Sequence, residues 1–367
     1  MKNYYFIISF LFTFIFFSCS KDENLEVLPK YHYFNGKIGV NDKSTVFSND
    51  GNVIICGRYN DNLFILKTSN AGKVIWRKEY YKSGNTIPSI IEVESGELYM
   101  CDANSLLFKL NSQGDTLWTK QINANSNFIV TDLIETADGN IILSKYDKNY
   151  GYDSELYKVD SNGNILWMKQ VLHKVITRIV ELNNGEIITS GYNGNGLSGK
   201  TLILSKYDST GSEIWSNSSY DIPLSTNINS LIRLPSGELM MSGNCQYGGT
   251  YDSEGHRNPV SSSPENFYLF KFDNSGNLVF SKTYGLGSAY SMKKNNDDTF
   301  TIIGNIETEV GILKIDKDGN KLLWKKTGDV TSGMFSNIVK DNENNIITGN
   351  YNGSVCMIIT DNNGVFK

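Results

Sequence analysis

Short apolar runs alternate with polar turns along most of the chain, and the turns follow two recurring phrases. The first phrase is an apolar run, then Lys, any residue, Asp or Asn, two further residues and Gly, with an aromatic residue about four positions later. The glycines of this phrase are Gly72, Gly114, Gly163, Gly211, Gly276, Gly319 and, in a truncated last copy, Gly364. Its aromatic residues are Trp76, Trp118, Trp167, Trp215, Phe280 and Trp324. All five tryptophans of the chain therefore lie in this phrase.

The second phrase alternates with the first and consists of an apolar segment, a turn that usually ends in Gly, and another short apolar segment. Its clear copies have their glycines at Gly51, Gly96, Gly139, Gly185 and Gly237. Degenerate copies run over 296–300 and 343–347. Seven copies of each phrase predict seven structural units.

Turn chemistry predicts four strands for each unit. An Asp side chain hydrogen-bonds the backbone of its own turn, and Gly supplies the positive φ that closes a hairpin. Two hairpins give a four-stranded antiparallel sheet, which buries both faces only by stacking against similar sheets around a ring. We therefore predict an all-β fold, a seven-bladed β-propeller that occupies residues 30–367 as a single domain. The Trp side chains should pack between adjacent sheets, and the phrase Lys should be solvated or salt-bridged.

The two ends of the chain predict how the ring closes. The seventh unit stops three residues after Gly364, where the other units continue through an outer strand. The segment 30–34 stands before the first unit and belongs to none. We predict that this N-terminal strand joins the last blade and completes it.

Residues 1–18 predict a lipoprotein signal peptide. Lys2 precedes an apolar stretch over 4–17, which is shorter than the roughly 20 residues that span a bilayer. The stretch ends at Ser18-Cys19, which resembles the relaxed lipobox of Bacteroidetes lipoproteins, although Phe16 stands where Leu is usual. The resemblance implies that Cys19 carries the lipid, that residues 19–29 form a flexible tether, and that the protein is held at the outer membrane or cell surface. An ordinary signal peptide with an incidental Cys19 is the alternative.

Composition narrows the classes of partner and cofactor. Net charge is −5 and the isoelectric point is near 5.4, which argues against nucleic-acid binding. The four cysteines after Cys19 show no CxxC spacing, and the three histidines are scattered, so that we predict no zinc site and no cofactor. Cys56 and Cys101 occupy equivalent positions in neighbouring units. Buried free thiols are the favoured interpretation of this pair, and a disulfide is the alternative.

The first phrase resembles the repeats of PQQ-like and WD-type propellers, and it is most similar to long-repeat lipoproteins of Bacteroidetes. The resemblance covers about residues 30–367 and implies a propeller. The PQQ-like motif has one more residue between Asp and Gly, so quinone binding is not implied. The Asp-box spacing of sialidases does not fit either.

Catalytic motifs of the GxSxG, HExxH and Walker types are absent from the sequence. The segment 316–320 resembles a calcium loop, but Lys325 stands where the bidentate Glu is required, so we interpret the segment as a turn. Polar residues stand seven positions before each second-phrase turn, at Ser44, Ser89, Asp132, Arg178, Ser230, Ser291 and Asn337. They predict a polar funnel with Asp132 and Arg178 as charged ligand contacts, and strand-end solvation is the alternative.

The loop between the second and third strands lengthens in units three, four and five, over 145–153, 192–200 and 245–265. Consecutive units would bring these loops to one rim. Their candidate ligand-binding residues are Tyr150, Tyr152, Tyr192, Tyr247, Tyr251, His256 and Arg257. Tyr suits sugar or peptide surfaces because it has an apolar face and a polar tip. A variable solvent loop is the alternative.

These observations favour a lipid-anchored, non-enzymatic binding or scaffold module for a protein or glycan. One alternative is an outer-membrane assembly factor of the PQQ-like propeller type. Another is a polysaccharide hydrolase or lyase.

Overall fold

The computed structural model describes residues 31–38, 43–82, 88–102, 105–123, 128–147, 153–194, 200–218, 226–246, 249–251, 257–259, 265–306, 309–326, 334–341 and 343–367. The predicted signal peptide, Cys19 and the tether lie outside these residues. The described part of the chain contains strands and turns but no helix, as the sequence predicted.

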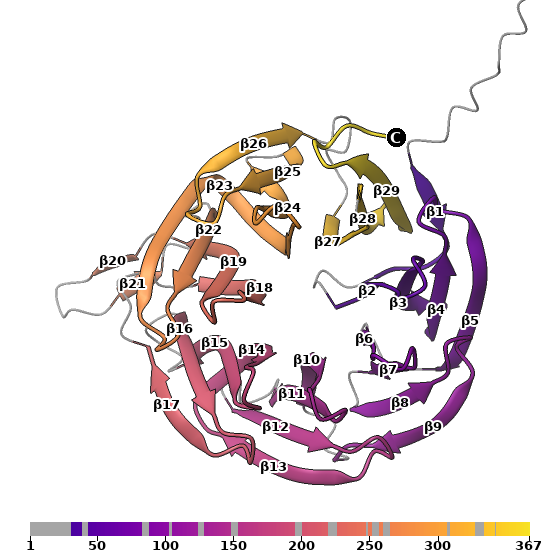
Figure 1. Cartoon of the computed structure of the whole chain (residues 1–367), viewed down its shortest axis with the longest axis horizontal. Coiled ribbons are helices and arrows are strands. Elements are labelled where there is room, and N and C mark those ends of the chain that lie inside the picture. Colours follow the sequence, from indigo (N-terminus) through magenta and orange to yellow (C-terminus); the bar gives the residue numbers. More distant parts are fainter. Residues whose placement is uncertain are drawn as a thin grey trace, which may run out of the picture.

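The first four sheets each contain four strands that follow one another in sequence and in space. The strands of the first two sheets are β2 (Thr45–Phe47), β3 (Val53–Tyr59), β4 (Asn62–Thr68) and β5 (Val74–Lys82), then β6 (Ser89–Glu92), β7 (Leu98–Cys101), β8 (Leu106–Leu110) and β9 (Thr116–Gln121). The strands of the next two are β10 (Phe128–Glu135), β11 (Ile141–Asp147), β12 (Ser154–Val159) and β13 (Ile165–Val171), then β14 (Lys174–Glu181), β15 (Ile187–Gly194), β16 (Lys200–Tyr207) and β17 (Glu213–Asn217). Figure 1 shows these sheets arranged around a common centre, with the first strand of each sheet innermost and the fourth outermost.

A seven-stranded sheet follows, because one long strand serves two sets of neighbours. Its strands are β18 (Thr226–Arg233), β19 (Leu239–Gln246), β22 (Glu265–Phe272), β23 (Leu278–Lys294), β24 (Phe300–Ile306), β25 (Glu309–Ile315) and β26 (Lys321–Lys326). The first half of β23 pairs with β22, and its second half, from Gly287 onward, pairs with β24. A separate hairpin, β20 (Gly249–Tyr251) and β21 (Arg257–Pro259), lies between β19 and β22 in the chain.

The last sheet combines the two ends of the chain. It contains β27 (Met334–Lys340), β28 (Asn344–Tyr351) and β29 (Ser354–Asp361), and its fourth strand is β1 (His32–Phe34). Tyr33 pairs with Cys356 in the antiparallel register of β1 and β29. The N-terminal segment therefore lies beside the last sheet, on the edge where the other sheets carry their fourth strand (Figure 1).

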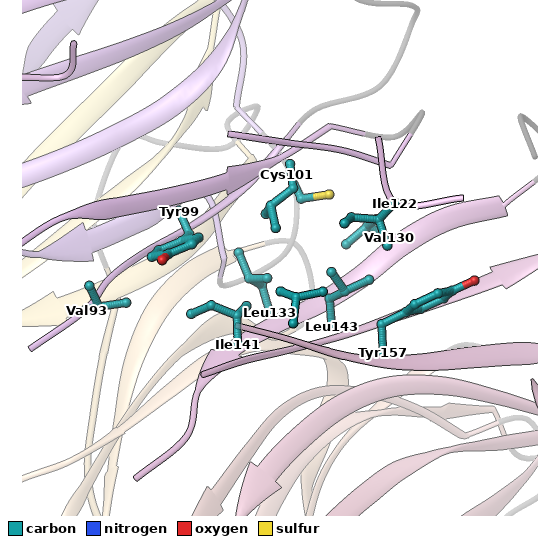
Figure 2. Close-up of a cluster of buried hydrophobic side chains, with 11 residues drawn as sticks. Val93, Tyr99, Cys101, Ile122, Val130, Leu133, Ile141, Leu143 and Tyr157 are labelled. Atoms are coloured by element: carbon teal, nitrogen blue, oxygen red, sulfur yellow. The ribbon is translucent and has the colours of Figure 1, made fainter. Parts of the chain in front are cut away.

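The hydrophobic core lies in layers between neighbouring sheets. Figure 2 shows the layer between the second and third sheets, where Tyr99 and Cys101 of β7 face Leu143 of β11 and Tyr157 of β12. A corresponding layer between the last and first sheets joins Val355 and Met357 of β29 to Val53 and Phe64 of β3 and β4, among other residues. Each sheet is thus buried on both faces by its neighbours, which is the physical reason that isolated four-stranded units need a ring.

The free thiols follow from this layering. All four described cysteines, Cys56, Cys101, Cys245 and Cys356, are buried and free. Cys56 packs in the layer between the first and second sheets, whereas Cys101 packs in the layer between the second and third. Equivalent positions in neighbouring sheets point into different layers, so the two thiols do not meet.

The Asp and Gly that recur in the first phrase form its turns as predicted. Asp160 Oδ1 accepts hydrogen bonds from the backbone N–H groups of Asn162 (2.9 Å) and Asn164 (2.8 Å), and Gly163 has a φ of 75°. Asp316, in the segment that resembles a calcium loop, binds Asp318 N and Asn320 N in the same way. The turn interpretation of this segment therefore agrees with the structure.

The Lys of each first phrase forms an ion pair with an acidic residue in or next to the second-phrase turn of the same unit. The six ion pairs are Lys67–Asp50, Lys109–Glu97, Lys158–Asp138, Lys206–Glu186, Lys271–Glu238 and Lys314–Asp297, at 2.6–3.0 Å. The two phrases of one unit are thus joined by one charge pair, which confirms the salt-bridged form of the prediction.

Candidate functional site

The last residues of the innermost strands surround the centre of the molecule, and they are acidic on one side of it and basic on the other. Figure 1 shows β2, β6, β10, β14, β18 and β27 nearest the centre, and the second half of β23 has the same place in its pairing order. These seven strands end, in chain order, at Phe47, Glu92, Glu135, Glu181, Arg233, Lys294 and Lys340. Three consecutive Glu are followed by three consecutive cations, so negative and positive charge lie on different sides of the centre. We call the face of the molecule on which these strands end the turn face.

The glutamates on the acidic side hold the turns of the preceding sheet. Glu92 accepts hydrogen bonds from Asn49 N (2.6 Å) and Ser48 Oγ (2.7 Å). Glu135 accepts from Glu94 N at 2.9 Å, and Glu181 accepts from Ala137 N at 2.7 Å. These carboxylates have a structural role that repeats from sheet to sheet.

The cations on the basic side have different partners. Lys294 pairs with Asp298 at 2.6 Å in its own turn. The Nε of Arg233 is buried and has no hydrogen-bond partner among the described residues. The position that would face Lys294 in the preceding turn is Pro235, which has no N–H for a carboxylate to bind. A Glu at position 294 would therefore lack the contact that the acidic side uses.

Lys340 is the most perturbed of these cations. Its Nζ donates to Asn345 Oδ1 at 2.6 Å and to Asn362 Oδ1 at 2.8 Å. Burial lowers the pKa of Lys340 to about 8, and the neighbouring Lys314 ammonium acts in the same direction. Both acceptors are neutral amide oxygens, which bind the Lys340 ammonium without compensating its charge.

Three cavities that share lining residues open at the turn face. The mixed cavity, of about 740 Å³, has Glu135, Glu181, Arg233, Lys43 and Lys294 among its lining residues. The lysine cavity, of about 380 Å³, is lined by Lys43, Lys293, Lys294 and Lys340 together with Thr45, Val46, Phe47, Ile90, Ile91 and Val339. The amide cavity, of about 570 Å³, adds Asn70, Asn295, Asn296, Asn362 and Lys314. Lys294 lines all three cavities.

Asp132, one of the predicted ligand contacts, lies in a contact between sheets. It is fully buried, and its Oδ1 accepts from Leu133 N while its Oδ2 accepts from Ile179 N of the next sheet at 2.7 Å. Lys43 Nζ lies 2.9 Å from Asp132 Oδ1. Because Lys43 immediately precedes the first sheet and Asp132 is in the third, this ion pair spans the second sheet at the centre.

Arg178, the other predicted contact in the funnel, is 6% exposed. Its Nε donates to Asn229 O of β18 at 2.7 Å, and its Nη1 donates to Thr177 O at 2.6 Å. The whole set at the seventh position before the turn is buried, and Asn337 Nδ2 donates to Ser44 Oγ at 2.9 Å between the last and first sheets. Asp132, Arg178 and Asn337 thus bind residues of a neighbouring sheet. A ligand-contact role for Asp132 and Arg178 stays a prediction.

The predicted rim lies on the face opposite the turn face, because loops between second and third strands connect the other ends of the strands. Among its candidates, Tyr192 is half-buried in β15 and pairs with Val175 and Leu202. Tyr251 and Arg257 are directly opposite each other in the β20–β21 hairpin. Tyr150, Tyr152, Tyr247 and His256 lie outside the described residues.

Within the described ranges, no group of three or more His, Cys, Asp or Glu side chains could hold a metal ion. The same part of the chain contains no helix that is long and apolar enough to cross a membrane.

The charge segregation at the turn face was missed by sequence reasoning. The sequence does contain its signal, at the fourth position before the Gly of each second phrase or its substitute. In chain order this position holds Phe, three Glu, one Arg and two Lys, so a comparison of the seven copies gives the order of the charges. It does not show that Lys43 and Lys293 join the same group.

Comparison with known proteins supports the class of fold. No protein-family model matches the chain, and no curated protein matches it by sequence. Among solved structures, the chain is similar to the C-terminal WD40 domain of Sif2, with a TM-score of 0.56, 9% identity and coverage of 90% of this chain and 98% of that one. The Dos1 propeller matches with a TM-score of 0.55 and 13% identity, over 93% of this chain and 97% of that one.

A third similar structure is the extracellular domain of the putative hybrid two-component system BT3049 from B. thetaiotaomicron. The TM-score is 0.56 and the identity 13%, over 90% of this chain. The chain spans only 41% of the length of that domain. At these identities the likeness concerns the fold alone. Together with the radial four-stranded sheets, it defines this chain as a β-propeller of the WD-repeat-like kind.

Proposed function

We propose that the propeller has seven blades and that β1 closes it. Counting β23 once for each of its halves divides the seven-stranded sheet into two four-stranded blades. The contact of His32 with Gly72 supports closure, since a Cβ on Gly72 would lie 2.5 Å from the His32 ring. Five of the equivalent glycines face a Trp or Phe of the preceding blade, so His32 has the role of that aromatic residue; Gly364 is the exception and faces Lys325.

We further propose that the protein is a non-enzymatic binding or scaffold module for a protein or glycan, and that its ligand enters at the turn face. The mixed cavity carries this proposal. Its 740 Å³ lies within the range of about 300–1,000 Å³ that accommodates small ligands. Its walls come from several sheets. Arg233 lines it, and the buried Nε of this side chain has no hydrogen-bond partner among the described residues.

The arrangement of acids favours binding over acid–base catalysis. General acid–base chemistry needs carboxylates that are free to exchange protons with a substrate. Asp132 binds two backbone N–H groups and Lys43, and the Glu side chains of the acidic side bind the turns of neighbouring sheets.

Binding is tested by equilibrium titration of the mature protein with defined oligosaccharides and peptides. An Arg233→Gln variant should weaken the ligand that binds by about tenfold, because it removes a charged donor from the cavity wall. Lys321→Gln, on an exposed outer strand, removes the same charge and should change affinity less than twofold. If wild type and Arg233→Gln bind every ligand with equal affinity, the ligand does not bind in the mixed cavity.

The second surface is the rim on the opposite face. Tyr192→Ala, Tyr247→Ala and His256→Ala should weaken binding if the three long loops contact the ligand. An unchanged affinity in all three variants would remove the rim from the proposal.

We propose that a lipid on Cys19 holds the module at the outer membrane or cell surface. The sequence at 1–19 supports this proposal, and the extracellular origin of the similar BT3049 domain is consistent with it. Labelled palmitate should enter the wild-type protein and be absent from a Cys19→Ala variant. Equal incorporation in both would overturn the anchor.

A further inference from the structure

The lysine cavity combines a strong local positive charge with an apolar floor. Lys43, Lys293, Lys294 and Lys340 approach it from three inner strands or their ends, and no acidic residue of the described part of the chain lines it. Its floor includes Ile90, which is fully buried, and Val339 and Thr45, which are each 4% exposed. The chain as a whole carries a net charge of −5, so this group of cations opposes the overall sign of the protein.

Holding four ammonium groups around one cavity costs stability. Like charges in a cleft with low-dielectric walls repel one another, and such clefts concentrate the counter-ions that relieve the repulsion. Two of the lysines have carboxylate partners, since Lys43 pairs with Asp132 and Lys294 pairs with Asp298. Neither carboxylate is among the cavity residues.

Lys340 lines both the lysine cavity and the amide cavity. The charged groups around it come from four places in the fold: Lys314 on β25, Asp297 in the turn after β23, Asp341 after β27, and Lys294 at the end of β23. Asp297 is bound to Lys314 at 3.0 Å, and Asp341 accepts from the side chains of Asn70 and Asn344. The two nearby carboxylates are therefore already engaged, and the hydrogen bonds of Lys340 go to amides.

We infer that the lysine cavity is a binding site for a small organic anion, one that carries at least two negative charges, on carboxylate or phosphate groups attached to an apolar framework. The lysine head groups would bind the anionic oxygens, and Val46, Phe47 and Ile91, each half-buried, would contact the apolar part. Lysine acts as a point charge and does not require the planar geometry that arginine imposes, so carboxylate and phosphate are both accepted. The inference rests on the proposed binding function and names the ligand class for one part of the turn face.

The size of the cavity favours a small molecule over an acidic protein segment. Its 380 Å³ is sufficient for a ring with several anionic substituents. The four lysines line one cavity, whereas lysines of the outer strands such as Lys78 and Lys282 bind the turn of the next unit.

The test is isothermal titration of the full mature protein with four probes. These are benzene-1,3,5-tricarboxylate, phenyl phosphate, the aliphatic tricarballylate, and neutral benzyl alcohol. We expect the first two to bind, tricarballylate to bind several-fold more weakly because it lacks the ring, and benzyl alcohol not to bind. Comparison of the first two probes also shows whether the cavity prefers a carboxylate ligand or a phosphate ligand.

The double variant Lys293→Gln/Lys294→Gln should weaken benzene-1,3,5-tricarboxylate by about tenfold or more, and Lys340→Gln should weaken it by about threefold to tenfold. Lys321→Gln should have less than a twofold effect. Affinity should also fall as salt is raised, because the contacts are ionic. Circular dichroism and the melting temperature establish that each variant is folded.

Three outcomes overturn the inference: equal binding by the double variant, equal binding of benzyl alcohol, or binding of a polyglutamate peptide without binding of either aromatic anion. If a neutral ligand binds and depends on Arg233 while the anions fail, the anion site is wrong and the proposed binding function stands. If neither class binds at the turn face, both proposals fail.

Discussion

The indole of Trp76 lies directly against Gly114 in the turn of the next sheet. A Cβ on Gly114 would be 2.9 Å from Trp76 Cη2, closer than a carbon can approach without displacement. The same relationship joins Trp118 to Gly163 and, with a Phe, Phe280 to Gly319. The aromatic residue of one unit thus requires the glycine of the next, which explains why the two recur together along the chain.

Gly114→Ala should destabilise the protein by about 2–4 kcal/mol. The positive φ of 79° costs roughly 1 kcal/mol for an L-residue, and the methyl group overpacks the indole by about 1–3 kcal/mol. Gly96→Ala is the matched control, since Gly96 has a φ of 82° but no atom of the described residues within 4 Å of its Cβ position. Urea unfolding should show a distinctly smaller loss for Gly96→Ala, and equal losses would show that the indole contact contributes nothing.

A buried ion pair gives a second prediction. Lys145 is fully buried, with its Nζ 3.1 Å from Glu155 Oε2 and near the Tyr157 and Phe128 rings. Lys145→Met should cost about 3–5 kcal/mol, because Glu155 would keep a buried charge without its partner. Lys158→Met, which breaks a pair with the half-exposed Asp138, should cost less than about 1 kcal/mol.

The double variant Lys145→Met/Glu155→Gln should recover much of that loss in chemical denaturation. Gln still accepts the hydrogen bond that Tyr157 Oη donates to Glu155 at 2.6 Å, and no charge remains. A double variant as unstable as Lys145→Met would show that packing, and not the unpaired charge, sets the cost.

Acid should weaken the charge pairs that join the two phrases of each unit. Burial opposes ionisation of Asp50, but hydrogen bonds from Lys67, Asn52 and Ser48 outweigh it and lower its pKa to about 2. The hydrogen bond from Thr299, with that from Lys314, lowers the pKa of Asp297 to about 2. A depressed carboxyl pKa stabilises the fold above the ordinary value near 4, and the contribution is lost as pH falls toward 2.

Urea midpoints measured between pH 6 and pH 2 should therefore fall mainly below pH 4. Lys67→Met should make this fall shallower, because it removes the partner of Asp50, whereas Lys321→Met should leave its slope unchanged. Identical profiles for wild type and Lys67→Met would contradict the assignment.

Asn350 links the last sheet to the segment that precedes the first. Its Nδ2 donates to Ile38 O at 2.8 Å, and its Oδ1 accepts from Ile38 N at 2.9 Å, across 312 positions of sequence. Asn350→Ala should cost about 1–3 kcal/mol through the two lost bonds, and Asn350→Asp should cost at least as much, because a carboxylate oxygen would then face Ile38 O. Asn363→Ala, on an exposed turn, is the control for thermal unfolding and should be nearly neutral.

Much of the local structure could be predicted from the sequence. The Asp and Gly of each phrase determine the turns because a side-chain oxygen and a positive φ act over four or five residues, which fixed spacing reveals. The packing of the Trp residues and the ion pairing of the phrase Lys follow from the same repeat. The predicted roles of Asp132 and Arg178 show where this reasoning stops, since their partners Ile179, Lys43 and Asn229 belong to other sheets.

The sequence by itself determined the all-β class, the paired turns and the residues that pack between sheets, because each depends on contacts within a unit or between successive units. Only the tertiary structure decided which residues meet at the centre. Lys43 is separated from Lys293 and Lys340 by most of the chain, and the three line one cavity because the sheets are arranged around a common centre. The order of the sheets in space, together with the direction of each inner strand, places the lysines on one side of the turn face and the glutamates on the other.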